Sequence, residues 1–571
     1  MDVAELEVAI VAKGNEIREL KANKQDVTDQ VAQLKLLKAN YKIAAGHEYG
    51  AAPGGETAPA PKVKQLTKKE LRKLEQQKAA EAAAAAKAAS VDPTKFGDAP
   101  LVQSQEAPSK HYVDVATINK SMDGQSFWVR GYLQTCRAKP KIAFLLVRQA
   151  AFTIQGVLTE SADVSKAMIK YASEIPRESV IDLFVTVTIP ANEITSTTQH
   201  DVELSVSKIF TISKALAVLP LQVEDAARSD TLVQAEDSDY VEVGLDTRLD
   251  NRVLDLRTPA NQAIMRIQSG VSQLFREFLY SKGFVEIHTP KLLGGASEGG
   301  ANCFAFDYFG EQAALAQSPQ LHKQMACACA GLEKVFEIGP VFRAENSFTA
   351  RHLCEFTGLD LEMTIKEHYS ECLDVFSELF IYVFDNLNSR FKRELEIINK
   401  QHPFEPLKYL NPTLVLKFDE AVRMLNEAGI DQDPLEDLST PNEKALGALV
   451  KEKYGTDFYF LDKFPLAVRP FYTMPDPNDK RWSNSYDFMI RGQEILSGAQ
   501  RVHDPALLVE RMHALGVPEK SLKAYIDAFK YGALPHAGGG VGLERVVMLF
   551  LGLPNIRKAS MFPRDPKRLQ P

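Results

Sequence analysis

The chain has 571 residues, of which 45% are hydrophobic and 25% charged, and a formal net charge of −8. This length exceeds what one hydrophobic core normally serves, so we expect several domains, while the negative charge excludes nucleic-acid binding by overall attraction. The six cysteines are too few and too irregularly spaced for a disulfide framework. The acidic N-terminus resembles neither a signal nor a transit peptide, and no apolar run approaches a membrane span. We therefore expect a cytoplasmic location and no membrane contact.

The first 48 residues predict a helical hairpin. Two apolar stripes have helical spacing, with Asp26 as the expected N-cap between them; their members are Leu6, Ile10 and Ile17, then Val27, Val31, Leu34 and Tyr41. The pattern VAKGNEIRELKANK followed by VAQLKLLKANYK resembles the WHEP domain, a helical hairpin appended to several metazoan synthetases and related proteins. That resemblance implies other synthetases as candidate partners, and a plain interaction hairpin is the alternative.

Residues 49–109 predict a linker with a basic helix. Residues 50–61 read GAAPGGETAPAP, without apolar periodicity, and residues 62–78 hold seven Lys or Arg against two Glu on strong helix formers. LTKKELRKL resembles the basic extension of fungal and animal aspartyl enzymes, which implies help in tRNA binding. A solvated charge run in a tether is the other interpretation.

Residues 110–220 change to a period of two, which indicates β-structure. Five β-rich runs, with one helical stretch near 162–175 between the third and fourth, predict an OB-fold barrel that commonly binds single-stranded nucleic acid; the runs are FWVRGYL, KIAFLLVRQ, FTIQGVL, VIDLFVTVTI and DVELSVSKIFTI. Residues 221–571, with a hinge at 221–245, alternate long helices and strands and predict an α+β domain built on an antiparallel sheet.

Three segments of this last domain resemble, in order, the signature motifs of class II aminoacyl-tRNA synthetases. They are GFVEIHTP (283–290), VFRAENSFTARHLCEFTGLDLEM (341–363) and GLER (542–545). The first implies a homodimer, with Pro290 at the interface. The fold class expected overall is multidomain: the helical hairpin, the OB-fold anticodon-binding domain and the class II catalytic domain.

The second motif predicts the site of ATP activation. Attack of a carboxylate on the α-phosphate needs positioning and charge neutralisation, and the planar fork of arginine can grip phosphate and carboxylate oxygens together. Arg343 is therefore the predicted α-phosphate residue. Glu345 is expected to accept from the adenine amino group, and Phe356 to stack on adenine. Arg351 and His352 are expected at the β- and γ-phosphates, beside Leu353.

The third motif and the segment before it complete the predicted ATP site. Gly542 allows nucleotide near the backbone, and Arg545 would cap adenine and hold the γ-phosphate, with Leu543 and Glu544 beside them. Carboxylates suit Mg2+ carried by the phosphates. Within YDFMIRGQEILSGAQRVHD (486–504), Glu494 is the first predicted ligand and Asp487 the assisting one. Arg343, Arg545 and Glu494 form the expected catalytic set.

Two further segments, GASEGGANCF (295–304) and AQSPQLHKQM (316–325), resemble the aspartyl-tRNA synthetases of eukaryotic cytosolic type. A pocket for a small acidic substrate needs fixed cations to offset desolvation of its carboxylate, and Lys323 and Arg501 are the predicted pair. The remaining contacts expected for L-aspartate come from Arg343 and from Glu298, Ser318, Gln320, Asp360 and Ser497. The resemblance implies ligation of aspartate to tRNA(Asp) with ATP.

The same resemblance assigns the barrel to the anticodon. Phe144 would stack on a base, while Gln155 and Glu203, with Arg137, would contact the anticodon and read base edges. Phe144 as part of the barrel core is the alternative. The loop 346–350, NSFTA, departs from the family, which more often has Asn and His near Phe348 and Ala350.

Two other functions compete with this hypothesis. Asparaginyl- or lysyl-tRNA synthetases share the three motifs but would lack the pair Lys323 and Arg501. A synthetase-like regulator that binds RNA without catalysis should have lost charge at Arg343, Glu494 or Arg545, and all three are present.

Overall fold

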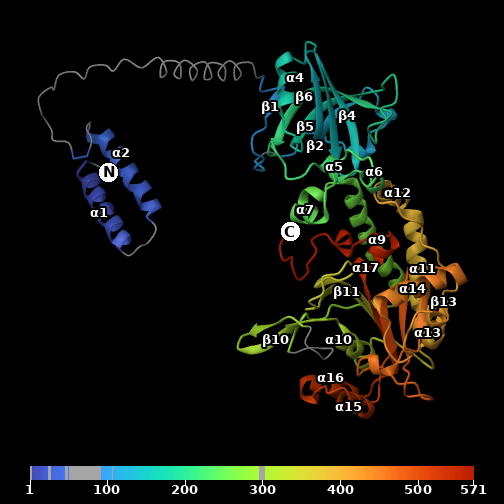
Figure 1. The fold of residues 1–571 in the computed structure, drawn as a ribbon. Helices are drawn as coiled ribbons and strands as arrows, with labels where there is room; N and C mark the ends of the chain where they lie inside the picture. Colours follow the sequence, from blue (N-terminus) through green and yellow to red (C-terminus); the bar gives the residue numbers. More distant parts are fainter. Residues whose placement is uncertain (1–2, 23–26, 46–48, 51–91, 106, 295–302) are drawn as a thin grey trace, which may run out of the picture. The chain divides into compact units, whose positions relative to one another are not determined.

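The computed structural model describes residues 3–22, 27–45, 49–50, 92–105, 107–294 and 303–571. The chain divides into two compact units, Met1–Ala89 and Ser90–Pro571, and each is described by itself (Figure 1). The expected basic helix at 62–78, the N-cap Asp26 and the loop residue Glu298 lie outside the described residues.

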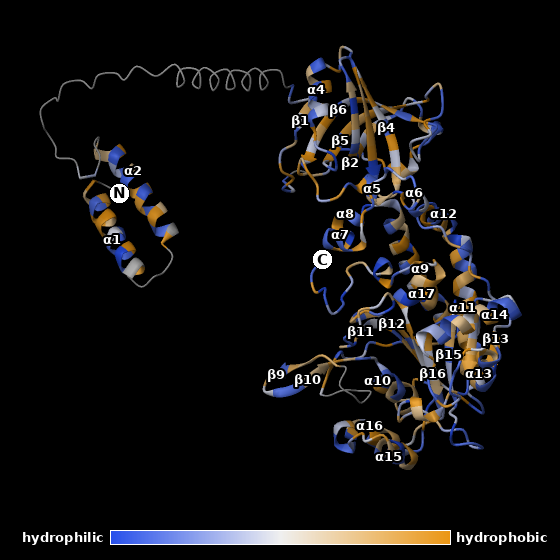
Figure 2. Cartoon of the chain, viewed as in Figure 1, coloured by the Kyte–Doolittle hydropathy of each residue, from blue (hydrophilic) through white to orange (hydrophobic). Residues whose placement is uncertain are grey.

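The first unit contains the expected hairpin, α1 (Val3–Ala22) and α2 (Thr28–Ala45). Leu6, Ile10 and Tyr41 form its small buried core, and Ile17 is also buried. Hydrophobic and hydrophilic residues alternate along both helices in Figure 2, as expected when one stripe of each helix is covered.

The second unit begins with a closed barrel. Its sheet has the order β1-β6-β4-β3-β2-β5, and additional pairing of β6 with β5 closes it. The strands are β1 (Phe96–Asp98), β2 (Ser126–Lys139), β3 (Ile142–Gln149), β4 (Phe152–Thr159), β5 (Val180–Thr188) and β6 (Glu203–Ser213), with α4 (Lys166–Glu174) between β4 and β5.

The five expected strands and the single helix are therefore present in the barrel, in the expected order. Strand β1 lies inside the range 49–109 that was expected to be linker, and it pairs in parallel with β6. Three residues are too short a run to show periodicity in sequence, which explains why this strand was not predicted.

Four short helices connect the barrel to the larger domain. They are α5 (Val223–Ala226), α6 (Asp230–Val233), α7 (Leu245–Asp250) and α8 (Arg252–Asp255). The Arg148 side chain of β3 forms a buried ion pair with Glu178, which also accepts a hydrogen bond from Arg257 at 3.1 Å. Charge-assisted hydrogen bonds thus join the barrel to the start of the larger domain.

An eight-stranded sheet of order β13-β14-β15-β16-β17-β12-β11-β7 organises the larger domain. Its six central strands pair antiparallel, whereas the edge strands β13 and β7 pair in parallel with their neighbours. The bounds are β7 (Val285–Glu286), β11 (Lys334–Phe342), β12 (Glu355–Thr364), β13 (Leu414–Lys417), β14 (Phe458–Asp462), β15 (Ser485–Ile490), β16 (Gln493–Gln500) and β17 (His536–Gly542).

Helices α9, α11 and α17 pack against this sheet in one continuous hydrophobic core. The helices of the domain are α9 (Pro259–Ser281), α10 (Gln320–Gln324), α11 (Ser370–Arg390), α12 (Lys392–Gln401), α13 (Phe418–Glu427), α14 (Thr440–Tyr454), α15 (Pro505–Ala514), α16 (Lys523–Lys530) and α17 (Leu543–Phe550). A small second sheet joins β8 (Leu292–Leu293), β10 (Glu311–Leu315) and β9 (Ala305–Tyr308). None of the described helices is long and apolar enough to cross a membrane.

Candidate active site

A cavity of about 330 Å³ opens over the centre of the eight-stranded sheet. Strand β12 supplies Phe356 and Asp360 to its wall, β16 supplies Glu494 and Ser497, and Arg343 follows β11 directly. Asp360 pairs with Gly540 of β17, and Gly540 pairs in turn with Ser497 of β16. Sheet register therefore brings together residues that are more than a hundred positions apart in sequence.

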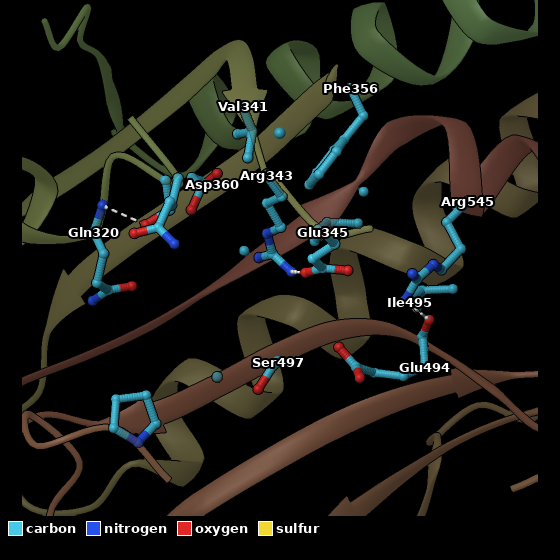
Figure 3. A pocket seen from close by; sticks show the side chains of 18 of the residues that line it. Gln320, Val341, Arg343, Glu345, Phe356, Asp360, Glu494, Ile495, Ser497 and Arg545 are labelled. Carbon is cyan, nitrogen blue, oxygen red and sulfur yellow. Dashed lines mark hydrogen bonds and ion pairs between the residues drawn. The ribbon is translucent and has the colours of Figure 1, made fainter. Parts of the chain in front are cut away.

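Figure 3 shows that the cavity has two ends. Gln320 and Asp360 lie at one end, Arg545 and Glu494 lie at the other, and Arg343 stands between them. We call these the amino-acid end and the nucleotide end, after the chemistry that their side chains suit.

The amino-acid end is built on a group of buried charges. Glu362 is fully buried and accepts from Arg501 Nε at 2.9 Å. Lys323 Nζ donates to Asp360 Oδ1 and to the Gly539 carbonyl, both at 2.9 Å, and lies 3.5 Å from Glu362 Oε2. Burial alone would raise the pKa of Glu362, but Arg501 and Lys323 outweigh it and hold the pKa below its usual value. Two cations and two carboxylates thus compensate one another inside the fold.

The glycine-rich strand β17 makes room for these carboxylates. A Cβ atom on Gly538 would lie 2.2 Å from Glu362 Oε2, and one on Gly540 would lie 2.8 Å from Asp360 Oδ1. Both separations are shorter than a van der Waals contact, so any larger residue would push the carboxylate out of place. The glycines of HAGGGVG therefore leave room for the carboxylates of Glu362 and Asp360 beside the strand.

Two donors at the amino-acid end remain available. Arg501 Nη2 donates to Gln320 Oε1 at 3.3 Å, while its Nη1 has no hydrogen-bond partner among the described residues. Gln320 Nε2 is buried and likewise has no partner in the described part of the chain. Both groups belong to residues that line the cavity, and both suit a carboxylate or carbonyl oxygen.

The nucleotide end gathers arginines and carboxylates. The Arg343 guanidinium lies 5.5 Å from the centre of the Phe356 ring, and its Nη1 is 4.0 Å from Glu345 Oε1. Arg545 Nη1 donates to the Glu494 backbone oxygen at 3.1 Å. The Thr357 amide N–H is shared by both carboxylate oxygens of Glu544, at 3.2 and 3.0 Å, and burial raises the pKa of Glu544 to about 7. Cations beside an aromatic face suit a nucleotide.

Most of the residues predicted for ATP and aspartate line this one cavity. They are Ser318, Gln320, Arg343, Glu345, Arg351, His352, Leu353, Phe356, Asp360, Glu494, Ser497, Arg501, Gly542, Glu544 and Arg545. The His352 ring contacts Thr349 Oγ1 at 2.6 Å, and burial lowers its pKa.

Three predicted residues lie behind the cavity wall instead. Leu543, the first residue of α17, is buried in the hydrophobic core. Lys323 is 1% exposed and its ammonium is occupied by Asp360, Glu362 and Gly539. The buried Asp487 bonds to Arg469 at 2.8 Å, and burial raises its pKa.

Sequence reasoning missed several residues of the site. Glu362 stands two positions after Asp360 on one strand, so the period of two could have identified it. Arg469 and Tyr472 line the cavity from an irregular loop, and no local pattern indicates this.

The residues predicted for the anticodon lie on the outside of the barrel. Phe144 pairs with Arg137 across β3 and β2, and Gln155 Nε2 donates to Glu203 Oε2 at 3.1 Å. Phe144 is half-buried and is not part of the barrel core, whereas its neighbours Ala143 and Leu145 are. Its ring therefore points away from the core, which leaves it accessible to a partner.

Comparison with known proteins identifies two domains. Residues 244–566 match the family tRNA synthetases class II (D, K and N), and residues 6–54 match the WHEP-TRS domain. The cytoplasmic aspartate–tRNA ligase of Bos taurus is 55% identical over 477 residues, which are 84% of this chain and 95% of that protein.

Two solved structures are also similar. An aspartyl-tRNA synthetase from Entamoeba histolytica is 46% identical with a TM-score of 0.78, covering 84% of this chain and 97% of that one. The asparaginyl-tRNA synthetase from Pyrococcus horikoshii, complexed with asparaginyl-adenylate, is 30% identical with a TM-score of 0.69, covering 81% and 100%. Both the sequence and the structural comparison confirm the predicted fold class and favour the aspartyl branch. The chain belongs to the aspartate–tRNA ligase family of class II tRNA synthetases.

Proposed function

We propose that this protein activates L-aspartate with ATP, forming aspartyl-adenylate and pyrophosphate, and then transfers aspartate to the 3′ end of tRNA(Asp). The observation that carries this proposal is the group of buried charges at the amino-acid end, where Arg501 lines the cavity and its Nη1 has no hydrogen-bond partner among the described residues. A buried cation of this kind favours an acidic side chain over a neutral one, because a carboxylate must be compensated when it leaves water.

At the amino-acid end, Arg501 and Gln320 bind the side-chain carboxylate of aspartate. Asp360 accepts from the substrate ammonium, and Ser318, Ser497 and Glu298 complete the contacts. Lys323 contributes from behind the wall, because its bonds to Asp360 and Glu362 hold both carboxylates in place. Both residues therefore contribute to the specificity for aspartate: Arg501 contacts the substrate carboxylate, and Lys323 positions the residues around it.

At the nucleotide end, Arg343 neutralises the α-phosphate that the aspartate carboxylate attacks. Phe356 stacks on adenine, whose amino group donates to Glu345, and Gly542 leaves room for the ring. Arg545 caps the ring and holds the γ-phosphate, while Arg351 and His352 contact the β- and γ-phosphates. In-line attack needs this alignment more than it needs proton transfer.

Glu494 is the proposed ligand of Mg2+. Its carboxylate belongs to a cavity-lining residue and has no hydrogen bond to the described residues, so its oxygens suit a cation that prefers carboxylate, water and phosphate. Asp487 is the second candidate, and its Oδ2 is held by Arg469. Mg2+ would neutralise charge on the β- and γ-phosphates, as in other phosphoryl-transfer sites.

The barrel is proposed to bind the anticodon of tRNA(Asp) through Phe144, Gln155, Glu203 and Arg137. Stacking tolerates any base, so the polar pair Gln155 and Glu203 must discriminate. The proposed basic helix at 62–78 would add phosphate contacts that do not select the tRNA.

A homodimer is proposed through the segment 283–290. Strand β7 within it is an edge strand, and Val285 is exposed there, so the edge can accept a second copy. Light scattering that shows an active monomer at micromolar concentration would refute this. Other synthetases are proposed as partners of the N-terminal hairpin, and the cytoplasm as the location, since the relatives are named cytoplasmic.

The function is tested by ATP–pyrophosphate exchange with a panel of amino acids. We expect aspartate to support exchange, and asparagine and lysine to give only background. Exchange that depends on asparagine or lysine would assign the chain to another branch of the family, and no exchange with any amino acid would favour a regulator without catalysis.

A further inference from the structure

We propose that Glu443 is a positioning residue for ATP, because it fixes the guanidinium of Arg351 at the nucleotide end of the cavity. Glu443 Oε2 lies 2.5 Å from Arg351 Nη1, although 92 positions separate the two residues. This inference rests on the proposed function, since it gives a partner to an arginine that is assigned to the phosphates. Glu443 itself does not line the cavity, and its side-chain hydrogen bond to Arg351 is its direct link to the nucleotide end.

The main chain fixes the position of Glu443. It lies in the first turn of α14, which Ser439 caps by accepting from the Asn442 amide. A Cβ atom on Gly447 of α14 would lie 2.4 Å from the Gly492 Cα atom, and one on Gly492 would lie 2.7 Å from the Glu443 backbone oxygen. Helix α14 thus touches the turn between β15 and β16 backbone to backbone, which only glycine allows.

This contact relates Glu443 to the catalytic strand. The turn that α14 touches leads directly into β16, and Glu494 is the second residue of that strand. The carboxylate that holds Arg351 therefore lies on a helix that packs against the hairpin carrying the proposed Mg2+ ligand.

The Arg351 side chain has two donor groups without a partner among the described residues. Glu443 occupies Nη1, and neither Nε nor Nη2 donates to any residue that the structure describes. The side chain is 21% exposed and lines the cavity. A guanidinium held on one side by a buried carboxylate can offer its other N–H groups to phosphate oxygens.

Without Glu443, the Arg351 side chain could adopt a second conformation, outside the nucleotide end. Arg351 and His352 also line a second hollow of about 390 Å³, whose wall includes Thr440 and Lys444 of α14. A long arginine side chain that lacks an anchor can turn into this hollow, and ATP must then spend binding free energy to order it. Burial raises the pKa of Glu443 to about 7, and Arg351 is the group that opposes this rise most strongly. The charge of Arg351 thus favours the ionised form of the carboxylate that holds it.

The test is Glu443→Ala, measured by ATP–pyrophosphate exchange at saturating aspartate. We expect the KM for ATP to rise about tenfold, which equals about 1.4 kcal/mol, while the KM for aspartate stays within twofold of the wild type. Glu443→Gln keeps an oxygen that accepts from Nη1 and should recover most of the affinity for ATP. Glu452→Ala is the matched control, because Glu452 is exposed on the same helix and has no ion pair among the described residues.

A double-mutant cycle separates positioning from a general structural role. In an Arg351→Ala background, Glu443→Ala should cause no further rise in the KM for ATP. An equal rise in both backgrounds, or an equal rise in the KM for aspartate, overturns the inference. If Glu443→Ala does not fold, Glu443→Asp replaces it in the same cycle, since the shorter side chain keeps the charge but not the contact.

The two proposals fail in different ways. Absence of aspartate-dependent exchange in the wild-type protein refutes the proposed function. Normal exchange in the wild type, together with an unchanged KM for ATP in the Glu443 variants, refutes only the role of Glu443.

Discussion

Replacing Arg501 with methionine tests the amino-acid end of the cavity. Arg501 is 3% exposed and donates from Nε to Glu362 Oε1 at 2.9 Å, so the change removes a buried cation but keeps an unbranched side chain that can fill part of its space. Glu362 would be left with Lys323 at 3.5 Å. The aspartate carboxylate would lose the donor that faces it.

The magnitude follows from the cost of an uncompensated buried charge. Removing one partner of a buried pair typically costs about 3 to 5 kcal/mol. At about 1.4 kcal/mol for each factor of ten, kcat/KM for aspartate should fall by roughly two to three and a half orders of magnitude. Asparagine carries no side-chain charge and should lose far less, so the preference for aspartate shrinks.

The assay is pyrophosphate exchange with each amino acid at saturating ATP. The KM for ATP should stay near the wild-type value, because Arg343, Glu494 and Arg545 are unchanged. A thermal unfolding curve checks that the variant is folded at the assay temperature. Equal losses for aspartate and asparagine would refute the reasoning and leave Arg501 as a scaffold residue.

Four other changes have defined outcomes. Gly447→Ala should destabilise the protein by about 1 to 3 kcal/mol, since a Cβ atom would overlap Gly492; denaturant unfolding measures this, and unchanged stability would contradict the backbone contact. Burial lowers the pKa of His536 from 6.5 to about 4, so the unfolded chain binds a proton more readily between these values and stability should fall by about 2 kcal/mol from pH 7 to pH 5. In urea unfolding, the His536→Asn variant should lack this loss of stability between pH 7 and pH 5. A variant whose stability depends on pH in the same way as the wild type would contradict the assignment to His536. Gln155→Ala should weaken charging of tRNA(Asp) about tenfold and spare pyrophosphate exchange, whereas loss of both would indicate a folding defect. Deleting residues 1–89 should leave exchange intact and flatten the salt dependence of tRNA binding by about 0.7 to 0.9 log units per lost phosphate contact; an unchanged slope would make this segment a tether.

The parts of the fold that sequence predicted are those with local signals. Strand periodicity identified the five barrel strands, and contiguous motifs predicted Arg343, Glu494 and Arg545, which all line the cavity and lie next to a recognisable strand or helix end. Strand β1 is not predicted, since three residues show no period and its partner β6 lies more than a hundred positions further along the chain.

The parts that sequence could not predict depend on contacts between distant segments. Glu443 reaches Arg351 only after α14 docks on the turn before β16, and nothing near either residue indicates that docking. Lys323 was expected to face the substrate, yet its position under the wall follows from bonds to Asp360 and Gly539, which sheet register brings to it. The sequence near each residue predicts which charges the site needs. It does not predict the direction in which each charged side chain points, because distant segments set that direction.

The most direct test of the whole account is transfer of radiolabelled amino acid to purified tRNA. The wild-type protein with ATP and Mg2+ should attach aspartate to a tRNA(Asp) transcript, and should attach neither asparagine to tRNA(Asn) nor lysine to tRNA(Lys) above background. Charging of tRNA(Asn) with asparagine at a comparable kcat/KM, or no acid-precipitable aspartate on tRNA(Asp), would contradict it.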